Sequence, residues 1–159
     1  MKATLAAIAL SAVSALAAPT TQPSPTKRQD AGHPYTISFI SLRHLTESNT
    51  YNFQFTATNY FDNGDPHFST TCQTAWNPSV PAGPENPQPC AYDAFSFYFP
   101  SGIQTLQNYG LTLVGPNGTV SGEIVSGPKY QCGPYEGQIG GIDYECKSTN
   151  GGWFVFPLV

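Results

Sequence analysis

Acidic side chains in this sequence could carry acid–base chemistry. Two Asp or Glu residues flanking a glycosidic bond can act as general acid and as base or nucleophile in its hydrolysis. Seven residues are candidates for such a pair: Asp62, Asp65, Asp93, Glu123, Glu136, Asp143 and Glu145. Because ten acids share a small surface, pairs arise by chance and spacing selects none of them. A glycan hydrolase therefore stays an alternative, and we assign no catalytic residue.

Nucleophilic catalysis and zinc binding have no matching motif. A serine hydrolase needs a nucleophile within hydrogen-bond reach of a positioned base. The sequence has no Gly-x-Ser-x-Gly motif, and its three histidines, His33, His44 and His67, are scattered. It also has no Cys-x-x-Cys pair, so the ligand spacing of a zinc site is missing.

Two glycine-containing segments resemble parts of ligand-binding loops. Residues 62–65 (Asp-Asn-Gly-Asp) resemble half of a calcium loop, but the bidentate Glu that completes such a loop is missing. The same residues form a good turn between strands without a metal, and we favour the turn. Residues 137–141 lack the strand–loop–helix context of a phosphate site, so we expect a loop there. We expect no metal and no other cofactor.

The four cysteines, Cys72, Cys90, Cys132 and Cys146, indicate two disulfides. Three connectivities are possible for four cysteines. Pairing of sequence neighbours would close two short loops, each stabilising the fold by about 3 kcal/mol in the chain-entropy description. We expect the cysteines to be structural rather than redox-active.

Residues 1–17 have the pattern of a secretory signal peptide. A basic start precedes an apolar run over residues 3–16, and Ala15-Leu16-Ala17 fits the cleavage site. The run is shorter than the roughly 20 apolar residues that a membrane-spanning helix needs. We therefore expect cleavage after Ala17 and export from the cell, rather than a membrane anchor.

Residues 18–28 are expected to be a propeptide. The segment is rich in Thr, Pro and Gln and ends in Lys27-Arg28, a dibasic pair typical of kexin-type processing sites; an accidental pair in a linker is the alternative. The mature chain, residues 29–159, would carry three basic and ten acidic side chains, a net charge of −7. This balance gives no footprint for nucleic acid or for an anionic membrane surface.

The mature segment has the pattern of a single all-β domain. The fifteen Pro and fifteen Gly of the whole chain disfavour long helices, and only residues 103–108 suggest a helical turn. Alternating residues in 51–58 place Tyr51, Phe53, Phe55 and Ala57 on one face, and Asn117-Gly118 is a strong hairpin signal. We expect a compact antiparallel β-barrel or sandwich, with strands over residues 35–42, 51–58, 67–74, 95–99, 111–114, 120–125, 142–146 and 153–156, the last two paired with each other.

Residues 76–89 contain five prolines, which disfavour a sheet ladder and favour an extended surface loop. Such a loop could be a stiff recognition arm that presents Trp76, or a protease-resistant connector, which we favour.

Asn117-Gly-Thr119 is a glycosylation sequon at the expected hairpin tip, although Asn-Gly equally serves the turn. The ligand-binding residues stay unknown at this point.

The order of these features resembles a known family. An aromatic strand ends in Arg43, a Cys72–Cys90 loop leads into Phe95-Ser-Phe-Tyr-Phe99, and Tyr130-Gln-Cys132 and Asp143-Tyr-Glu-Cys146 precede a final apolar strand. With the dibasic propeptide, this resembles the fungal secreted β-barrel family typified by the major allergen of Alternaria, which includes plant-defence elicitors. The resemblance covers most of residues 35–159.

The resemblance implies a secreted fungal β-barrel with the pairs Cys72–Cys90 and Cys132–Cys146 and no established enzymatic activity. The type member has an extra cysteine near its mature N-terminus that links a dimer, and residues 29–35 here have none. We therefore expect a monomer or a non-covalent dimer. The leading hypothesis is a non-enzymatic elicitor-, effector- or allergen-like binding protein acting on a plant extracellular protein or a small apolar ligand. Alternatives are the hydrolase above and a structural cell-wall protein.

Overall fold

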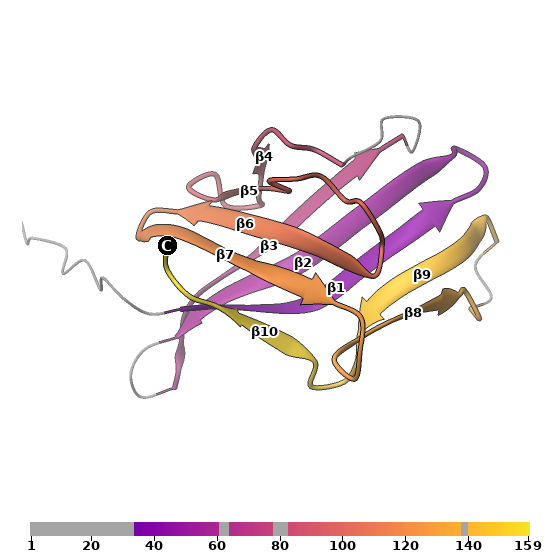
Figure 1. Cartoon of the computed structure of the whole chain (residues 1–159). Coiled ribbons are helices and arrows are strands. Elements are labelled where there is room, and N and C mark those ends of the chain that lie inside the picture. The colour runs from indigo at the N-terminus through magenta and orange to yellow at the C-terminus, as the bar shows by residue number, and fades with distance from the viewer. Residues whose placement is uncertain (1–33, 61–63, 78–82, 138–139) are drawn as a thin grey trace, which may run out of the picture.

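The computed structural model describes residues 34–60, 64–77, 83–137 and 140–159. In these residues the chain forms β-strands and no helix (Figure 1). The expected signal peptide, the propeptide and the processing pair Lys27-Arg28 lie outside the described residues. The strands are β1 (Tyr35–Leu45), β2 (Thr50–Tyr60), β3 (Pro66–Trp76), β4 (Gln88–Pro89), β5 (Ser96–Tyr98), β6 (Asn108–Gly115), β7 (Gly118–Val125), β8 (Tyr130–Pro134), β9 (Ile142–Ser148) and β10 (Trp153–Phe156).

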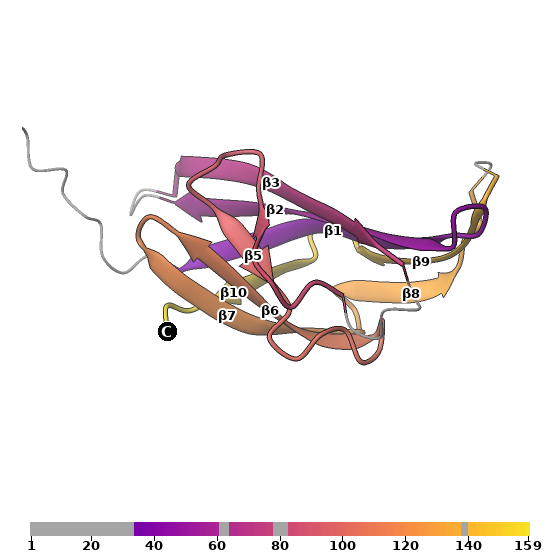
Figure 2. The ribbon, with the colours of Figure 1, turned by 90° about the horizontal axis from the view of Figure 1, so that it is seen from above.

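The strands form two antiparallel sheets, one over the other (Figure 2). The larger sheet has the order β3-β2-β1-β9-β8, with β10 also paired to β1, and the smaller has the order β4-β5-β6-β7. Among the described residues, the sheets are joined by isolated bridges, Cys72 to Cys90 and Val120 to Leu158, rather than by a continuous ladder. The fold is therefore a sandwich, which confirms the all-β prediction, and the barrel alternative is wrong because the sheets do not close.

Alternation along β2 builds much of the core. Phe53, Phe55 and Ala57 are fully buried on one face, as the sequence pattern predicts. Phe97 and Phe99 meet them from the smaller sheet, with ring centroids 5.1 Å apart for both Phe55–Phe97 and Phe53–Phe99. Both pairs are edge-on, the arrangement that aromatic quadrupoles favour. Burial of each ring contributes about 1.5–3 kcal/mol of transfer free energy.

The two disulfides confirm the pairing that the family resemblance implies. Cys72 on β3 is joined to Cys90, next to β4, so this bond links the two sheets. Cys132 on β8 is joined to Cys146, directly opposite on β9. The first bond therefore holds the two sheets together, and the second holds β8 to β9.

The predicted pairing of the last two strands is wrong. Residues 142–148 (β9) and 153–156 (β10) do not pair with each other; both pair with β1, at different places along it. The hairpin over residues 115–118 is confirmed, with Gly118 at φ +127°. Residues 103–108 contain turns and a bridge but no helix. Asn108 already begins β6, where it pairs with Val125, and Thr105 bridges to Asn108, so the segment is used to enter the β6–β7 ladder.

Two strands were not predicted. In β4, Pro89 takes part in a two-residue ladder with β5, against the expectation that the prolines exclude pairing. Because β4 is at the edge of its sheet, the missing proline N–H is not needed on the open side. The strand β8 begins at Tyr130 and pairs with β9 next to the Cys132–Cys146 bond.

Candidate binding groove

A bulge in β1 re-aims one aromatic side chain. Ser38 pairs with Thr56 of β2 and Ser41 pairs with Gln54, so two residues of β1 face one residue of β2. One of the two, Phe39, has φ +50°, a left-handed conformation that costs a bulky residue roughly 1–2 kcal/mol. Its ring points outward and is 75 % exposed, while Ile40 beside it is buried in the core.

At the bulge, the strand that pairs with the other edge of β1 changes from β10 to β9. Residues 35–38 pair with β10, and residues 41–45 pair with β9. Between these two ladders, the buried Ile40 would have an amide without a strand partner. The Ile40 amide instead donates to the hydroxyl of Ser148, with N and Oγ 3.0 Å apart. A side chain at the end of β9 thus satisfies the bulge.

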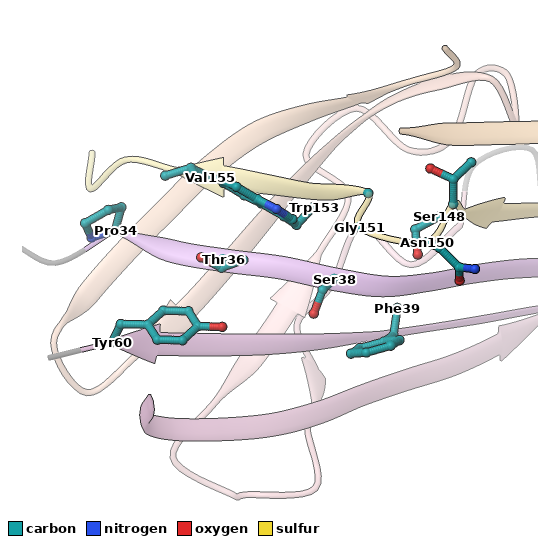
Figure 3. Close-up of a pocket in the computed structure, with 12 residues that line it drawn as sticks. Pro34, Thr36, Ser38, Phe39, Tyr60, Ser148, Asn150, Gly151, Trp153 and Val155 are labelled. Carbon is teal, nitrogen blue, oxygen red and sulfur yellow. The ribbon is translucent and has the colours of Figure 1, made fainter. Parts of the chain in front are cut away.

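A groove of about 670 Å³ lies on the outer face of the larger sheet at this junction (Figure 3). Thr36 and Ser38 of β1 lie along its middle, opposite Val155 and Trp153 of β10 in the strand register. Phe39 and Tyr60 lie on the other side of β1. The remaining lining residues are Pro34, Ser148, Thr149, Asn150, Gly151 and Gly152.

Four of the groove side chains are large, apolar and exposed. Trp153 and Val155 are 46 % and 47 % exposed. Phe39 is more exposed than these two residues, and Tyr60 is somewhat less exposed. Outer faces of sandwiches usually carry polar residues. Several large apolar side chains gathered on such a face indicate a binding site.

The loop between β9 and β10 forms one end of the groove and is tightly fixed. The Thr149 amide donates to the Lys129 carbonyl (3.0 Å), the Thr149 hydroxyl donates to the Pro128 carbonyl (2.8 Å), and the Gly152 amide donates to the Thr149 carbonyl (2.7 Å). A Cβ at Gly152 would collide with the Lys129 carbonyl oxygen, so only glycine fits there. The groove end is therefore preformed.

The groove lining carries no Asp, Glu, His, Lys or Arg among the residues that the structure describes. One cation contacts a ring of the described lining: the Lys129 ammonium lies 5.1 Å from the centroid of the Trp153 ring, a cation–π contact. General acid–base chemistry needs a titratable side chain within reach of the reacting atom. The described lining offers a ligand apolar side chains together with hydroxyl and amide groups.

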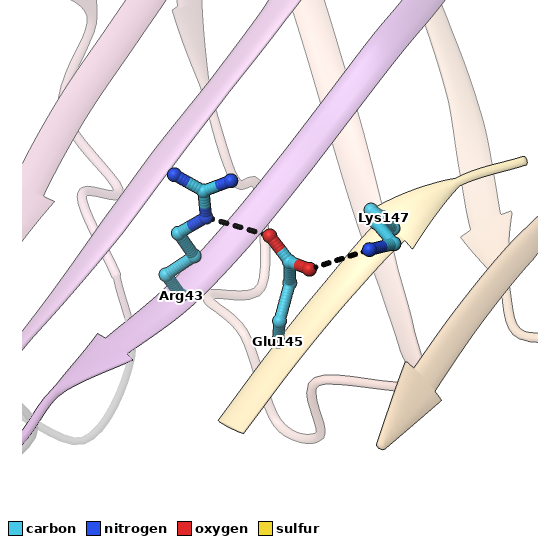
Figure 4. Close-up of polar contacts among 3 residues, drawn as sticks. All are labelled: Arg43, Glu145 and Lys147. Atoms are coloured by element: carbon cyan, nitrogen blue, oxygen red, sulfur yellow. Dashed lines mark hydrogen bonds and ion pairs between the residues drawn. The ribbon is translucent and has the colours of Figure 1, made fainter. Parts of the chain in front are cut away.

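One acidic candidate, Glu145, lies between two cations elsewhere on this sheet (Figure 4). Its Oε1 accepts a bond from Arg43 Nε at 2.6 Å, and its Oε2 is 2.9 Å from Lys147 Nζ. Burial acts to raise the pKa of Glu145, but hydrogen bonds and charge from Lys147 and Arg43 outweigh it and lower the pKa. A glycosidase general acid needs a raised pKa, so Glu145 serves as a tie between β1 and β9.

A second acidic candidate, Asp143, pairs with a histidine. His44 Nδ1 is 2.7 Å from Asp143 Oδ1, and His44 Nε2 is 3.2 Å from Asn49 Oδ1. In a catalytic triad the second ring nitrogen faces a nucleophile. Here an amide oxygen occupies that position and the ring packs on Tyr51. The cluster joins β1, β2 and β9 at the end of the sheet.

The other predicted site residues are dispersed. Asp65, Asp93, Glu123 and Glu136 are exposed, whereas Asp62 lies outside the described residues, as does part of 137–141. No group of three His, Cys, Asp or Glu in the described part of the chain could hold a metal ion. Asn117 is in the β6–β7 turn and half-buried, so the sequon keeps its predicted place and its occupancy stays a prediction.

Trp76 does not project from an arm. It ends β3 and packs half-buried on Tyr51 and Phe99, with ring centroids 5.6 and 6.0 Å away. Residues 78–82 of the proline-rich segment lie outside the described residues. The exposed tryptophan is instead Trp153, which sequence reasoning assigned only to a strand. Residues 153–156 are all apolar, and this sequence feature could have predicted apolar side chains on both faces of β10.

Compared with known proteins, the chain matches no protein-family model and no curated protein. None of the described segments forms a helix long and apolar enough to cross a membrane.

Proposed function

We propose that this chain is a secreted, non-enzymatic binding protein that holds an uncharged ligand with an apolar face in the groove between β1, β10 and the end of β2. The observation that carries the proposal is Phe39. A bulky residue in the left-handed region costs free energy, and here the ring gains little burial in return. Strain that places an aromatic ring on the surface is typical of a ligand site.

The chemistry of the lining supports binding without catalysis. Aromatic and aliphatic side chains alternate with neutral hydroxyl and amide groups, the composition of a small-molecule site. The volume of about 670 Å³ is within the roughly 300–1,000 Å³ range of such sites. The groove does not support the hydrolase alternative, since Asp143 and Glu145 lie outside it, where Asp143 is hydrogen-bonded to His44 and Glu145 pairs with Arg43 and Lys147.

Action outside the cell is part of the proposal. Residues 1–17 have the pattern of a secretory signal, and two disulfides are compatible with an extracellular protein. The resemblance to the Alternaria allergen family suggests fungal origin and an elicitor- or effector-like role toward a plant. Mature protein infiltrated into leaves should provoke a defence response that reduction of the disulfides abolishes. An inert native protein would contradict the elicitor role.

Tryptophan fluorescence can test the groove directly. The chain has two tryptophans, so Trp76→Phe leaves Trp153 as the single reporter. We expect the uncharged dye Nile red to quench Trp153 emission in this variant. In the wild-type background, Phe39→Ala and Trp153→Ala should each weaken dye binding at least tenfold. Val125→Ala, which removes an exposed apolar side chain on β7, is the matched control and should bind normally. Dye binding that is unchanged in both groove variants would contradict the proposal.

A further inference from the structure

We infer that the ligand class of this groove is a neutral polysaccharide, with sugar rings lying on the exposed aromatic side chains and sugar hydroxyls bonded to the polar groups between them. The inference rests on the proposed function and names its ligand. It follows from three properties of the groove: the arrangement of its rings, its unused hydrogen-bonding groups and its lack of charge.

The rings lie along an open groove on a sheet face. Trp153 is on one side of β1, and Phe39 and Tyr60 are on the other (Figure 3). A pyranose ring has an apolar face of C–H groups that covers an aromatic ring well, and a rim of hydroxyls. A purely apolar ligand such as a lipid would keep much of its surface in water here, because the four large apolar side chains of the groove are themselves between 38 % and 75 % exposed.

Neutral polar groups lie between the rings with hydrogen-bonding capacity to spare. The side chains of Thr36, Ser38 and Asn150 line the groove and form no hydrogen bond with another described residue. Their neighbours Ser148 and Thr149 are engaged, with the Ile40 amide and the Pro128 carbonyl. Unused hydroxyl and amide groups beside aromatic rings fix the orientation of a ligand that has many hydroxyls of its own.

The charge of the protein argues against an anionic ligand. The described lining has no ionised side chain, and the expected mature chain has a net charge of −7. An acidic polysaccharide or a fatty acid would be repelled at long range. Lys129 is the single cation that contacts a lining ring within the described part of the chain. Its contribution can be separated by the substitution Lys129→Gln, which removes the charge.

The test is retention of the mature protein on insoluble cellulose, chitin and β-1,3-glucan, with soluble polygalacturonate as an anionic competitor. We expect wild-type protein to be retained by at least one neutral polymer. Trp153→Ala, Phe39→Ala and the double variant Thr36→Ala/Ser38→Ala should each lower retention at least tenfold. Val125→Ala and Lys129→Gln should be retained like wild type, and polygalacturonate should not compete.

Three results would overturn the inference. These are retention by none of the neutral polymers, retention that survives the groove substitutions, and retention that depends on Lys129 and is lost to polygalacturonate. A change in Trp153 emission when soluble oligosaccharides are added to the Trp76→Phe variant gives a second measurement that needs no substitution in the groove. If Nile red binding requires Phe39 and Trp153 but no glycan retains the protein, the polysaccharide inference is wrong and the proposed function still stands.

Discussion

The hydroxyl of Ser148 accepts a hydrogen bond from the backbone amide of Ile40, with the two atoms 3.0 Å apart. The contact joins the end of β9 to the bulge of β1, 108 residues earlier in the chain. Because Phe39 precedes Ile40 in that bulge, one hydroxyl supports the strained segment that turns the Phe39 ring into the groove. Fold and candidate site therefore depend on the same side chain.

Removing this hydroxyl should destabilise the protein. We expect Ser148→Ala to lower the free energy of unfolding by about 1–2 kcal/mol, because the buried Ile40 amide loses its acceptor. Binding of Nile red should weaken as well, since Phe39 loses its support. Urea unfolding and dye titration measure the two effects. Ser126→Ala, at an exposed position, is the control; equal stability of the two variants would show that the contact contributes nothing.

The strain at Phe39 can be measured by comparing two substitutions. Phe39→Ala and Phe39→Gly both remove the ring, but only glycine adopts φ +50° without a Cβ penalty. We expect the Gly variant to be about 1 kcal/mol more stable than the Ala variant, and both to lose dye binding. Thermal unfolding reports the difference.

Thr56 of β2, opposite Ser38 in the register, provides the matched comparison for Phe39. Its backbone does not have a positive φ, so Gly there should be less stable than Ala by about 1 kcal/mol. The order of the two substitutions should therefore reverse between positions 39 and 56. The same order at both positions would mean that the bulge stores no strain.

The Glu145 ion pairs should make stability depend on pH. The folded state lowers the pKa of Glu145 below its ordinary value of about 4.5, so its contribution is present above that pH and is lost as the pH falls through the folded-state value. At pH 7 we expect Glu145→Gln to cost about 1 kcal/mol, discounted for the exposed Arg43 and Lys147. Denaturant unfolding between pH 7 and pH 3 should show the two proteins converging.

An exposed acid on β7, Glu123, gives the control for this titration. Glu123→Gln removes the same charge without breaking an ion pair to Arg43 or Lys147. Its stability should stay within about 0.5 kcal/mol of wild type across the range. A Glu145→Gln penalty that persists at pH 3 would contradict the electrostatic explanation.

The two disulfides should differ in their effect on stability. Cys72 and Cys90 are both buried and link the sheets, whereas Cys132 is only partly buried and its bond lies within one sheet. We expect each double Cys→Ala variant to lose about 3 kcal/mol, with the larger loss for Cys72/Cys90 because it also removes core packing. Chemical unfolding measures this, and peptide mass mapping of the native protein should find both bonds and no free thiol.

Local sequence patterns predicted much of the fold. Alternation of Phe53, Phe55 and Ala57 is a property of one strand, and so is the Asn-Gly turn of the β6–β7 hairpin. The edge strand β4 was missed because the low strand propensity of proline is a local property. Whether a sheet tolerates a proline depends on whether its strand lies at the edge, which the tertiary structure decides. The pairing of β9 with β10 was wrong for a related reason: their short connection suggested a hairpin, but each finds a better partner in β1.

By itself, the sequence determined the all-β class, most strand positions and a set of cysteines suited to two bonds, because period-two burial and turn chemistry act between near neighbours. Only the tertiary structure decided that Phe39 leaves the alternation of β1 and joins Trp153 and Tyr60 on one outer face. The bulge forms where one strand exchanges β10 for β9, and the Ser148 hydroxyl that supports it arrives from a distant segment. No window of neighbouring residues contains that contact.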